Sequence, residues 1–230
     1  MTTNRRSLLL GGLALLGLPA GARGQGQNQW TKLKGDEGQP VGNARLPVEL
    51  VSQVDAMPGR IQVGSKAPDV VLAEFYDYNC PWCRKAAQDI GALVENDPDL
   101  RISLIGNPIL SPGSKQAAAV EAAVQNLSGD DAAFRFHARM FAEPGRADLA
   151  KAVRIAAEAT GRAAADFERV SASREAQAQV ADQLRLAANL GFIATPTFVL
   201  GGLGVFGYPG PRSTAKMIAA LRSCGEVACR

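Results

Sequence analysis

One stretch decides the fold: residues 70–83 read VVLAEFYDYNCPWC. Its first half, Val70–Tyr76, is apolar apart from Glu74, which is typical of a central strand covered by helices on both faces. Its end, Cys80–Cys83, opens a helix-like run that continues to about Glu95. Two thiols at a strand-to-helix junction close a disulfide easily, and the helix N-terminus stabilises the thiolate that reopens it. The stretch therefore predicts a redox-active pair.

The two cysteines are expected to play different roles. Cys80 is the predicted nucleophile, because it lies at the expected N-cap, where free N–H groups and the helix dipole favour negative charge. Pro81 suits the first helical position, where a missing N–H costs nothing. Arg84 and Lys85 add positive charge within the first turn. Cys83, one turn later and more buried, is the predicted resolving thiol.

A C-x-x-C pair is also half of many zinc sites. Zinc would require a second pair of cysteines, or histidines at matching spacing. His137 is the only histidine, and we expect it to be an ordinary helix residue. The other cysteines, Cys224 and Cys229, lie about 140 residues away. The sequence therefore favours redox chemistry, and neither a metal nor a cofactor is expected.

Residues 1–22 are typical of a cleaved export signal. Arg5 and Arg6 form its charged region, Leu8–Leu18 its apolar run, and the residues up to Ala22 a small-residue cleavage site. The apolar run is shorter than the ~20 residues that span a bilayer. The paired arginines leave both the Sec and the twin-arginine route open. The mature protein is expected to be soluble in the periplasm, where disulfides persist.

The composition is that of a soluble globular protein, with 230 residues, 47% of them hydrophobic and 20% charged. The net charge is +3, and removal of Arg5 and Arg6 leaves about +1. Because the chain also lacks a basic stripe with interleaved aromatic residues, no nucleic-acid partner is expected.

Residues 23–45 are rich in Gly, Gln and Asn. We therefore expect residues 23–59 to form a flexible N-terminal arm, within which Leu46–Met57 has the pattern of a short helix. Ile61–Val63 predicts an edge strand. Arg101–Gly106 predicts a second parallel strand, which completes a βαβ unit. The alanine-rich region at about 111–191 predicts a helical insert of four or five short helices.

Strand character returns at Thr197–Leu200. The pair Gly201-Gly202 predicts a tight turn into a return strand at Leu203–Phe206, and Thr214–Arg222 has the pattern of a final amphipathic helix. The whole order predicts an α/β fold with an inserted all-helical subdomain.

The segment Glu74–Cys83, taken with Ala194–Phe198 far downstream, resembles the DsbA-type thiol-disulfide oxidoreductases of the thioredoxin superfamily. The resemblance covers about residues 60–223. It implies a thioredoxin-like fold, with a DsbA-like domain over residues 60–230 that contains the helical insert.

The resemblance implies roles for three further residues. Pro196 matches the family's cis-proline, which lies beside the active cysteines. Thr195 would offer backbone groups to a substrate strand. Glu74, six residues before Cys80, matches a buried acid that relays protons, and burial should raise its pKa. A salt-bridged surface glutamate is the alternative.

The chain departs from the family's pattern between the cysteines. Strong oxidants of the family usually have Pro-His there, whereas this chain has Pro81 and Trp82. Tryptophan cannot supply the histidine's charge to the thiolate, so we expect a milder oxidant. Both residues are expected to contact substrate, Trp82 through its flat apolar surface.

Cys224 and Cys229, spaced C-x4-C near the C-terminus, are expected to form a local structural disulfide. Closing so short a loop stabilises by only ~2 kcal/mol, so its loss should be tolerated. A second redox pair that relays electrons to Cys80–Cys83 is the alternative.

Three functions remain open. The leading hypothesis is a periplasmic oxidase that donates the Cys80–Cys83 disulfide to exported proteins and is reoxidised by a DsbB-like membrane partner. The second is a disulfide reductase or isomerase, usually oligomeric, kept reduced by a DsbD-like membrane donor. The third is a copper-tolerance protein that binds Cu(I) through the two thiolates, although the extra Met and His residues of copper carriers are missing.

Overall fold

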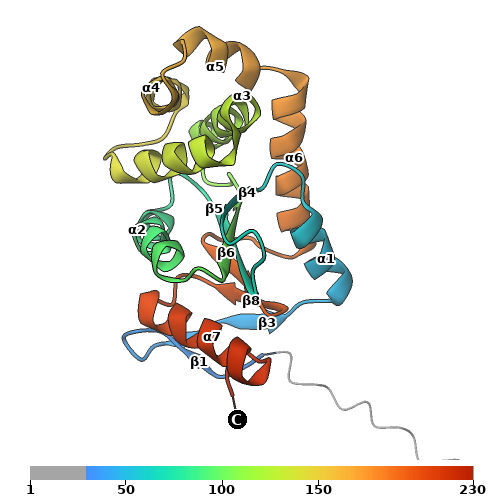
Figure 1. The fold of residues 1–230 in the computed structure, drawn as a ribbon. Coiled ribbons are helices and arrows are strands. Elements are labelled where there is room, and N and C mark those ends of the chain that lie inside the picture. The colour runs from blue at the N-terminus through green and yellow to red at the C-terminus, as the bar shows by residue number, and fades with distance from the viewer. Residues whose placement is uncertain (1–29, 230) are drawn as a thin grey trace, which may run out of the picture.

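The computed structural model describes residues 30–229, so the predicted export signal lies outside the described residues. The strands are β1 (Leu33–Lys34), β2 (Pro40–Val41), β3 (Asn43–Arg45), β4 (Ile61–Gly64), β5 (Val70–Tyr76), β6 (Leu100–Gly106), β7 (Thr197–Leu200) and β8 (Leu203–Phe206). The helices are α1 (Val48–Ala56), α2 (Pro81–Asn96), α3 (Pro112–Ala142), α4 (Leu149–Thr160), α5 (Ala164–Ser171), α6 (Arg174–Asn189) and α7 (Pro211–Cys224). Figure 1 shows their arrangement.

Six strands form the main sheet, in the order β3-β8-β7-β5-β6-β4. β5 and β6 are parallel, and the other neighbouring strands are antiparallel. The predictions of a central strand at Val70–Tyr76 and an edge strand at Ile61–Val63 are therefore confirmed. The β7–β8 hairpin turns at Gly201 and Gly202, whose φ angles of 56° and 75° favour glycine.

Side chains of β5 alternate between two cores, as a pleated strand requires. Leu72 and Tyr76 face a large cluster beneath α2 and α7. Ala73 and Phe75 face a smaller cluster with residues of α1 and α6. Glu74 lies between Leu72 and Tyr76 in the alternation, so its side chain points to the α2 face, on which the two active cysteines also lie.

The helical insert occupies one end of the molecule, where α3, α4 and α5 pack together and α6 returns along the sheet (Figure 1). The predicted break at Ser128-Gly129 lies inside α3, where Gly129 has a φ of 79°. This break is confirmed, because the φ and ψ angles of Gly129 are not helical and α3 consists of two helices that meet at a kink there. Together with α4, α5 and α6, they agree with the predicted four or five short helices.

The prediction of a flexible arm over residues 23–59 is wrong for the part that the structure describes. β1 and β2 form a two-stranded ribbon, which we call the N-terminal ribbon. β3 pairs with β8 at one edge of the main sheet. α1 packs Val54 and Met57 into the smaller core. Strands of two or three residues are too short to give a periodic pattern, so the glycine-rich composition concealed them.

The ribbon is fixed to α7 by Asp36. Gly210, the N-cap of α7, has no side chain to accept the first N–H groups of the helix. The Asp36 carboxylate accepts them instead, from Arg212 N at 3.1 Å and Ser213 N at 2.7 Å. A residue 176 positions away in sequence therefore caps the helix.

We expect Asp36→Ala to lower the free energy of unfolding by about 1 kcal/mol, because it leaves these N–H groups without their acceptor. Urea unfolding of the wild type and the variant measures the difference. Glu37→Ala, which removes the neighbouring exposed carboxylate, is the matched control and should unfold like the wild type. Equal midpoints for the two variants would contradict the capping role.

Candidate active site

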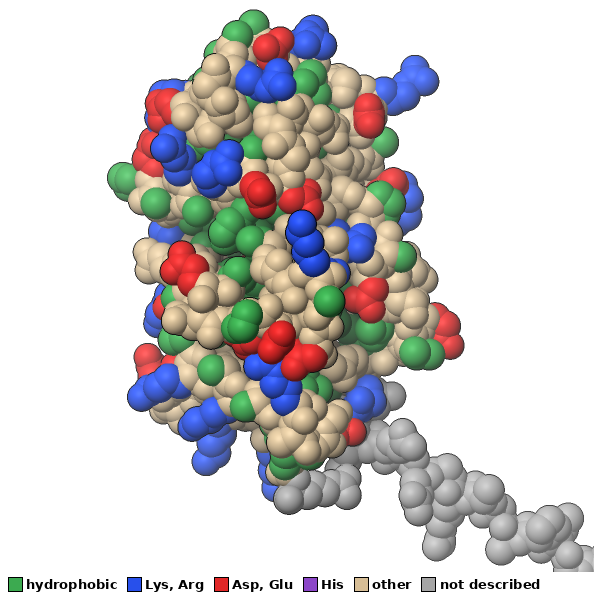
Figure 2. Space-filling model, viewed as in Figure 1, with side chains coloured by type: hydrophobic (Ala, Val, Ile, Leu, Met, Phe, Trp, Pro, Cys, Tyr) green, Lys and Arg blue, Asp and Glu red, His purple; other side chains and the backbone are tan. Residues whose placement is uncertain are grey.

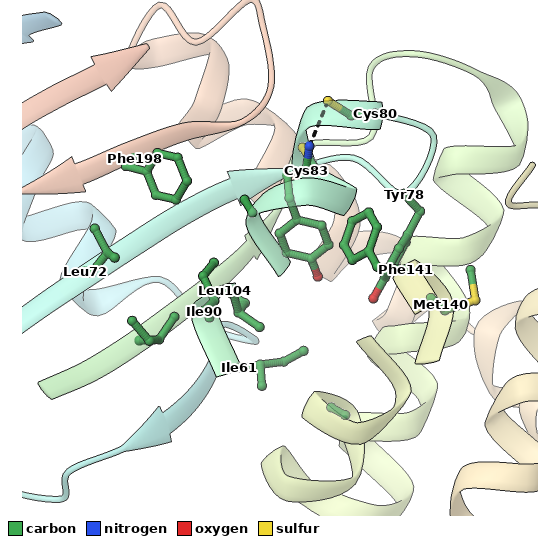
Figure 3. Close-up of a cluster of buried hydrophobic side chains, with 14 of the residues drawn as sticks. Ile61, Leu72, Tyr78, Cys80, Cys83, Ile90, Leu104, Met140, Phe141 and Phe198 are labelled. Atoms are coloured by element: carbon green, nitrogen blue, oxygen red, sulfur yellow. Dashed lines mark hydrogen bonds between the residues drawn. The ribbon is translucent and has the colours of Figure 1, made fainter. Parts of the chain in front are cut away.

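Cys80 and Cys83 lie at the start of α2, both as free thiols. Cys80 is the N-cap of the helix and Pro81 occupies its first turn, as the sequence predicted. The backbone N–H of Cys83 donates to Cys80 Sγ at 3.3 Å (Figure 3). Cys80 is 4% exposed and Cys83 is fully buried.

The two thiols differ in acidity. The pKa of Cys80 falls to about 6, because the Cys83 thiol and the backbone N–H groups at the start of α2 stabilise the thiolate by more than burial disfavours it. Burial raises the pKa of Cys83 well above its ordinary value. Near neutral pH the reduced site therefore holds a Cys80 thiolate beside a protonated Cys83.

The loop before β7 completes one side of the site. The Thr195–Pro196 peptide bond is cis, as the resemblance implied. The Cys80 thiol donates to the Thr195 carbonyl oxygen at 3.2 Å. β7 follows directly and pairs with β5, with Thr197 opposite Phe75. Adjacent strands thus bring together two segments that lie 115 residues apart in sequence.

Glu74 is fully buried, and neither of its carboxyl oxygens has a hydrogen-bond partner among the described residues. Burial, followed by the negative charge of Cys80, raises the pKa of Glu74 to about 8. The alternative of a salt-bridged surface glutamate is therefore wrong. With a pKa of about 8, the Glu74 carboxyl group is largely protonated at neutral pH.

Two residues of the loop between β5 and α2 tie the active site to the helical insert. The Asp77 carboxylate accepts from Asn79 N at 2.7 Å, from the Ser114 hydroxyl at 2.7 Å and from Leu110 N at 2.8 Å. The Asn79 side chain bonds both backbone groups of Ala147, at 2.8 and 3.1 Å. Sequence reasoning gave these residues no role, although an Asp that accepts from the N–H two positions later is a known turn pattern.

A buried polar cluster joins the end of β5, and the loop that follows it, to α3. The hydroxyls of Tyr76 and Tyr78 both donate to Glu121, and His137 Nδ1 lies 3.6 Å from the Glu121 carboxylate. Burial, followed by the charge of Glu121, raises the pKa of both tyrosines well above their ordinary value. Figure 3 shows Tyr78 packed beside Phe141 of α3. Sequence reasoning did not identify Glu121. A single acidic residue within an alanine-rich apolar helix is nevertheless a signal of a buried polar cluster.

Two hollows flank the cysteines. One, of about 380 Å³, lies toward the helical insert and includes Cys80 and Pro81 in its wall. The other, of about 390 Å³, lies toward the N-terminal ribbon and includes Trp82, Thr195 and Pro196. The predicted substrate contacts therefore line surfaces on both sides of Cys80. Trp82 is 58% exposed, and Lys85 Nζ lies 5.6 Å from the centre of its ring, a cation–π contact.

The structure contains the predicted disulfide between Cys224 and Cys229. It closes the C-terminal end of α7, whereas Pro211 at the other end of that helix lines the hollow beside Trp82. A helix of this length separates its ends by ~20 Å. That separation does not favour an electron relay to Cys80.

Within residues 30–229, no three His, Cys, Asp or Glu side chains are grouped so that they could hold a metal ion. No helix of the described region has the length and apolar character to cross a bilayer.

The family model of the DSBA-like thioredoxin domain matches residues 71–219, more than half of the chain. The chain belongs to this family. It is therefore a DsbA-like thiol-disulfide oxidoreductase, an enzyme of disulfide exchange, with a thioredoxin-like fold.

Solved structures agree with the DsbA-like assignment. A thioredoxin-like oxidoreductase from Silicibacter pomeroyi DSS-3 is 31% identical with a TM-score of 0.68, over 75% of this chain and 98% of that one. The thiol-disulfide exchange protein alpha-DsbA2 from Wolbachia pipientis shares the fold at 22% identity and a TM-score of 0.67, over 75% and 94% of the two chains. The catalytic domain of Proteus mirabilis ScsC also shares the fold, at 21% identity and a TM-score of 0.64, over 76% of this chain and 96% of that one. Among curated proteins, none matches.

The acidity of Cys80 in this DsbA-like site is expected to depend on the Cys83 thiol. In reduced wild-type protein, the alkylation rate of Cys80 by iodoacetamide should rise with pH about a midpoint near 6. Cys83→Ala removes the main donor and should raise that midpoint by ~1 pH unit. Cys83→Ser keeps a donor and is the matched control. A midpoint that is the same in all three proteins would contradict this cause.

The raised pKa of Glu74 predicts a pH-dependent effect on stability. Between pH 4.5 and about 8, the folded protein holds a proton that the unfolded chain releases, so this group disfavours folding increasingly as the pH rises. Because Glu74→Gln cannot ionise, its gain in unfolding free energy over the wild type should grow by about 2–4 kcal/mol between pH 4.5 and 8.5.

Urea unfolding of the reduced proteins at the two pH values measures this gain. Glu95→Gln, which alters an exposed carboxylate of α2, is the control and should show no such growth. A Glu74→Gln gain that does not change with pH would show that Glu74 is ionised in the folded protein.

Proposed function

We propose that the protein is a periplasmic oxidase that donates the Cys80–Cys83 disulfide to reduced exported proteins. The observation that carries this proposal is the low pKa of Cys80, about 6. Hydrogen bonds that stabilise the Cys80 thiolate stabilise the reduced form of the enzyme. A stabilised reduced form makes the disulfide a better electron acceptor.

The proposed reaction transfers two electrons from a substrate dithiol to the enzyme. A substrate thiolate attacks Cys80 Sγ, the Cys80–Cys83 bond breaks, and Cys83 leaves as a thiolate. Glu74 supplies the proton that Cys83 requires because of its high pKa. The second substrate thiolate then attacks the substrate sulfur and releases Cys80, which leaves as the stabilised thiolate. The substrate gains a disulfide and the enzyme becomes a dithiol.

The backbone of Thr195, beside cis-Pro196, suits the pairing of an extended substrate strand, with Pro81 and Trp82 as further contacts. We assign a structural role to Cys224–Cys229, which lies at the far end of α7. Export by residues 1–22 with cleavage near Ala22, and reoxidation by a DsbB-like membrane protein, complete the proposal. Figure 2 shows acidic and basic side chains interspersed over the face it draws, which gives no support to a nucleic-acid partner.

A reductase or isomerase kept reduced by a DsbD-like donor is the second candidate. Trp82 favours it, because its side chain adds no hydrogen bond or charge to the Cys80 thiolate and so leaves the potential lower than a histidine would. The two candidates differ in redox potential and in assembly, and both properties are measurable on the purified protein.

The oxidised protein should convert a reduced dithiol peptide to its disulfide, and Cys80→Ser should abolish this activity. The double variant Cys224→Ser, Cys229→Ser is the control and should keep it. Equilibration with glutathione should give a potential between about −230 and −120 mV. A potential near the ~−270 mV of thioredoxin, in a protein that light scattering finds to be an oligomer, would favour the reductase or isomerase instead.

A further inference from the structure

The hollow between Cys80 and the helical insert has an unbalanced charge. Two arginines line it, Arg84 from α2 and Arg146 from the loop between α3 and α4, and no acidic residue does. We call it the arginine hollow. Its wall consists of Tyr78, Asn79, Cys80, Pro81, Arg84, Ala142, Pro144, Gly145 and Arg146.

Arg84 is a fixed charge. Its guanidinium group donates to the carbonyl oxygens of Phe141 and of Glu143, the latter at 2.9 Å. Carbonyl groups hold the side chain in place without neutralising it. Arg146 is exposed, and neither arginine forms an ion pair with any described residue.

The nearby acids are already engaged. The Glu143 carboxylate binds Arg154, and Asp148 caps α4 by accepting from the N–H of Lys151. The ammonium group of Lys151, from the first turn of α4, adds a third cation beside this loop, 2.9 Å from the Glu143 carbonyl oxygen. Burial, followed by the charge of Arg84, lowers the pKa of Lys151, which places those two cations close together. The local field is therefore positive.

The position of the arginine hollow makes it accessible to a bound substrate. Cys80 forms part of its wall, and Thr195 lies on the other side of the sulfur. An extended strand advances ~3.3 Å per residue. A substrate cysteine in contact with Cys80 therefore brings the side chain of a neighbouring residue to the arginine hollow.

We propose that the arginine hollow is a subsite for a carboxylate, and that its occupant is an Asp or Glu side chain next to the reacting cysteine of an exported protein. This identification of the substrate rests on the proposed disulfide exchange. Arginine suits the role because its planar guanidinium group binds carboxylates through paired hydrogen bonds. The subsite adds no chemical step. It raises the rate at which acidic partners meet Cys80, and salt weakens the effect.

The first test uses two small probes of the Cys80 thiolate in the reduced protein. Iodoacetate and iodoacetamide are similar in size, but only iodoacetate carries a carboxylate. Because both react with the same thiolate, the ratio of their rates cancels any change in its acidity. At low ionic strength, Arg146→Gln should lower the iodoacetate-to-iodoacetamide ratio by about 1.5- to 5-fold. Arg174→Gln, an exposed arginine of α6, is the matched control and should keep the wild-type ratio.

The second test compares two reduced dithiol peptides that differ only in a Glu or Gln beside the attacking cysteine. The oxidised wild type should oxidise the Glu peptide about 1.5- to 5-fold faster, and the two rates should converge in Arg146→Gln and in high salt. Reduced glutathione forms a third arm. If it depends on Arg146 while the peptides do not, the occupant is a small acidic thiol and the protein substrate is overturned.

The outcomes separate the subsite from the proposed function. If neither peptide is oxidised, the oxidase proposal fails, while the alkylation ratio still decides whether the subsite exists. If Arg146→Gln and Arg174→Gln give the same ratio, the subsite is overturned, whatever the peptides do.

Discussion

The arrangement of the active site depends on how a polar loop is buried. Residues 77–80 leave a central strand and enter α2 beneath the helical insert, where unpaired polar groups are costly. Asp77 and Asn79 resolve this by bonding to the start of α3 and to Ala147 beyond its end. The insert therefore sets the position of Cys80, and it also supplies one wall of the adjacent hollow. The all-helical subdomain is therefore part of the active site, although both thiols lie on the α/β part of the fold.

The features that could be predicted from the sequence are those that a local pattern of residues determines. The apolar run Val70–Tyr76, the Gly201-Gly202 turn and the helix that starts at Cys80 each carry their signal within a few residues. The burial of Glu74 was also indicated locally, by the apolar strand around it, whereas its expected role in proton transfer came from the family resemblance. The cis bond at Pro196 followed from family resemblance, and no local pattern in the chain required it.

Features that the sequence did not predict are those set by contacts between distant residues. The N-terminal ribbon is held in place because Asp36 accepts hydrogen bonds from the first N–H groups of α7, 176 residues away. Nothing in the sequence near Asp36 indicates that partner. The pairing of Tyr76 and Tyr78 with Glu121 likewise joins a strand to a helix beyond the reach of any periodic pattern. Short strands and buried polar clusters become visible only when tertiary structure supplies their partners.

The order of strands in the sheet also sets the order in which the enzyme matures. β7 lies between β5 and β8, so the edge of β5 stays open until residues 197–200 have been made. A chain that ends after α6 carries both thiols but not Thr195, whose carbonyl oxygen lies 3.2 Å from Cys80 Sγ. The active site is therefore complete only when a segment 115 residues beyond Cys80 has folded beside it.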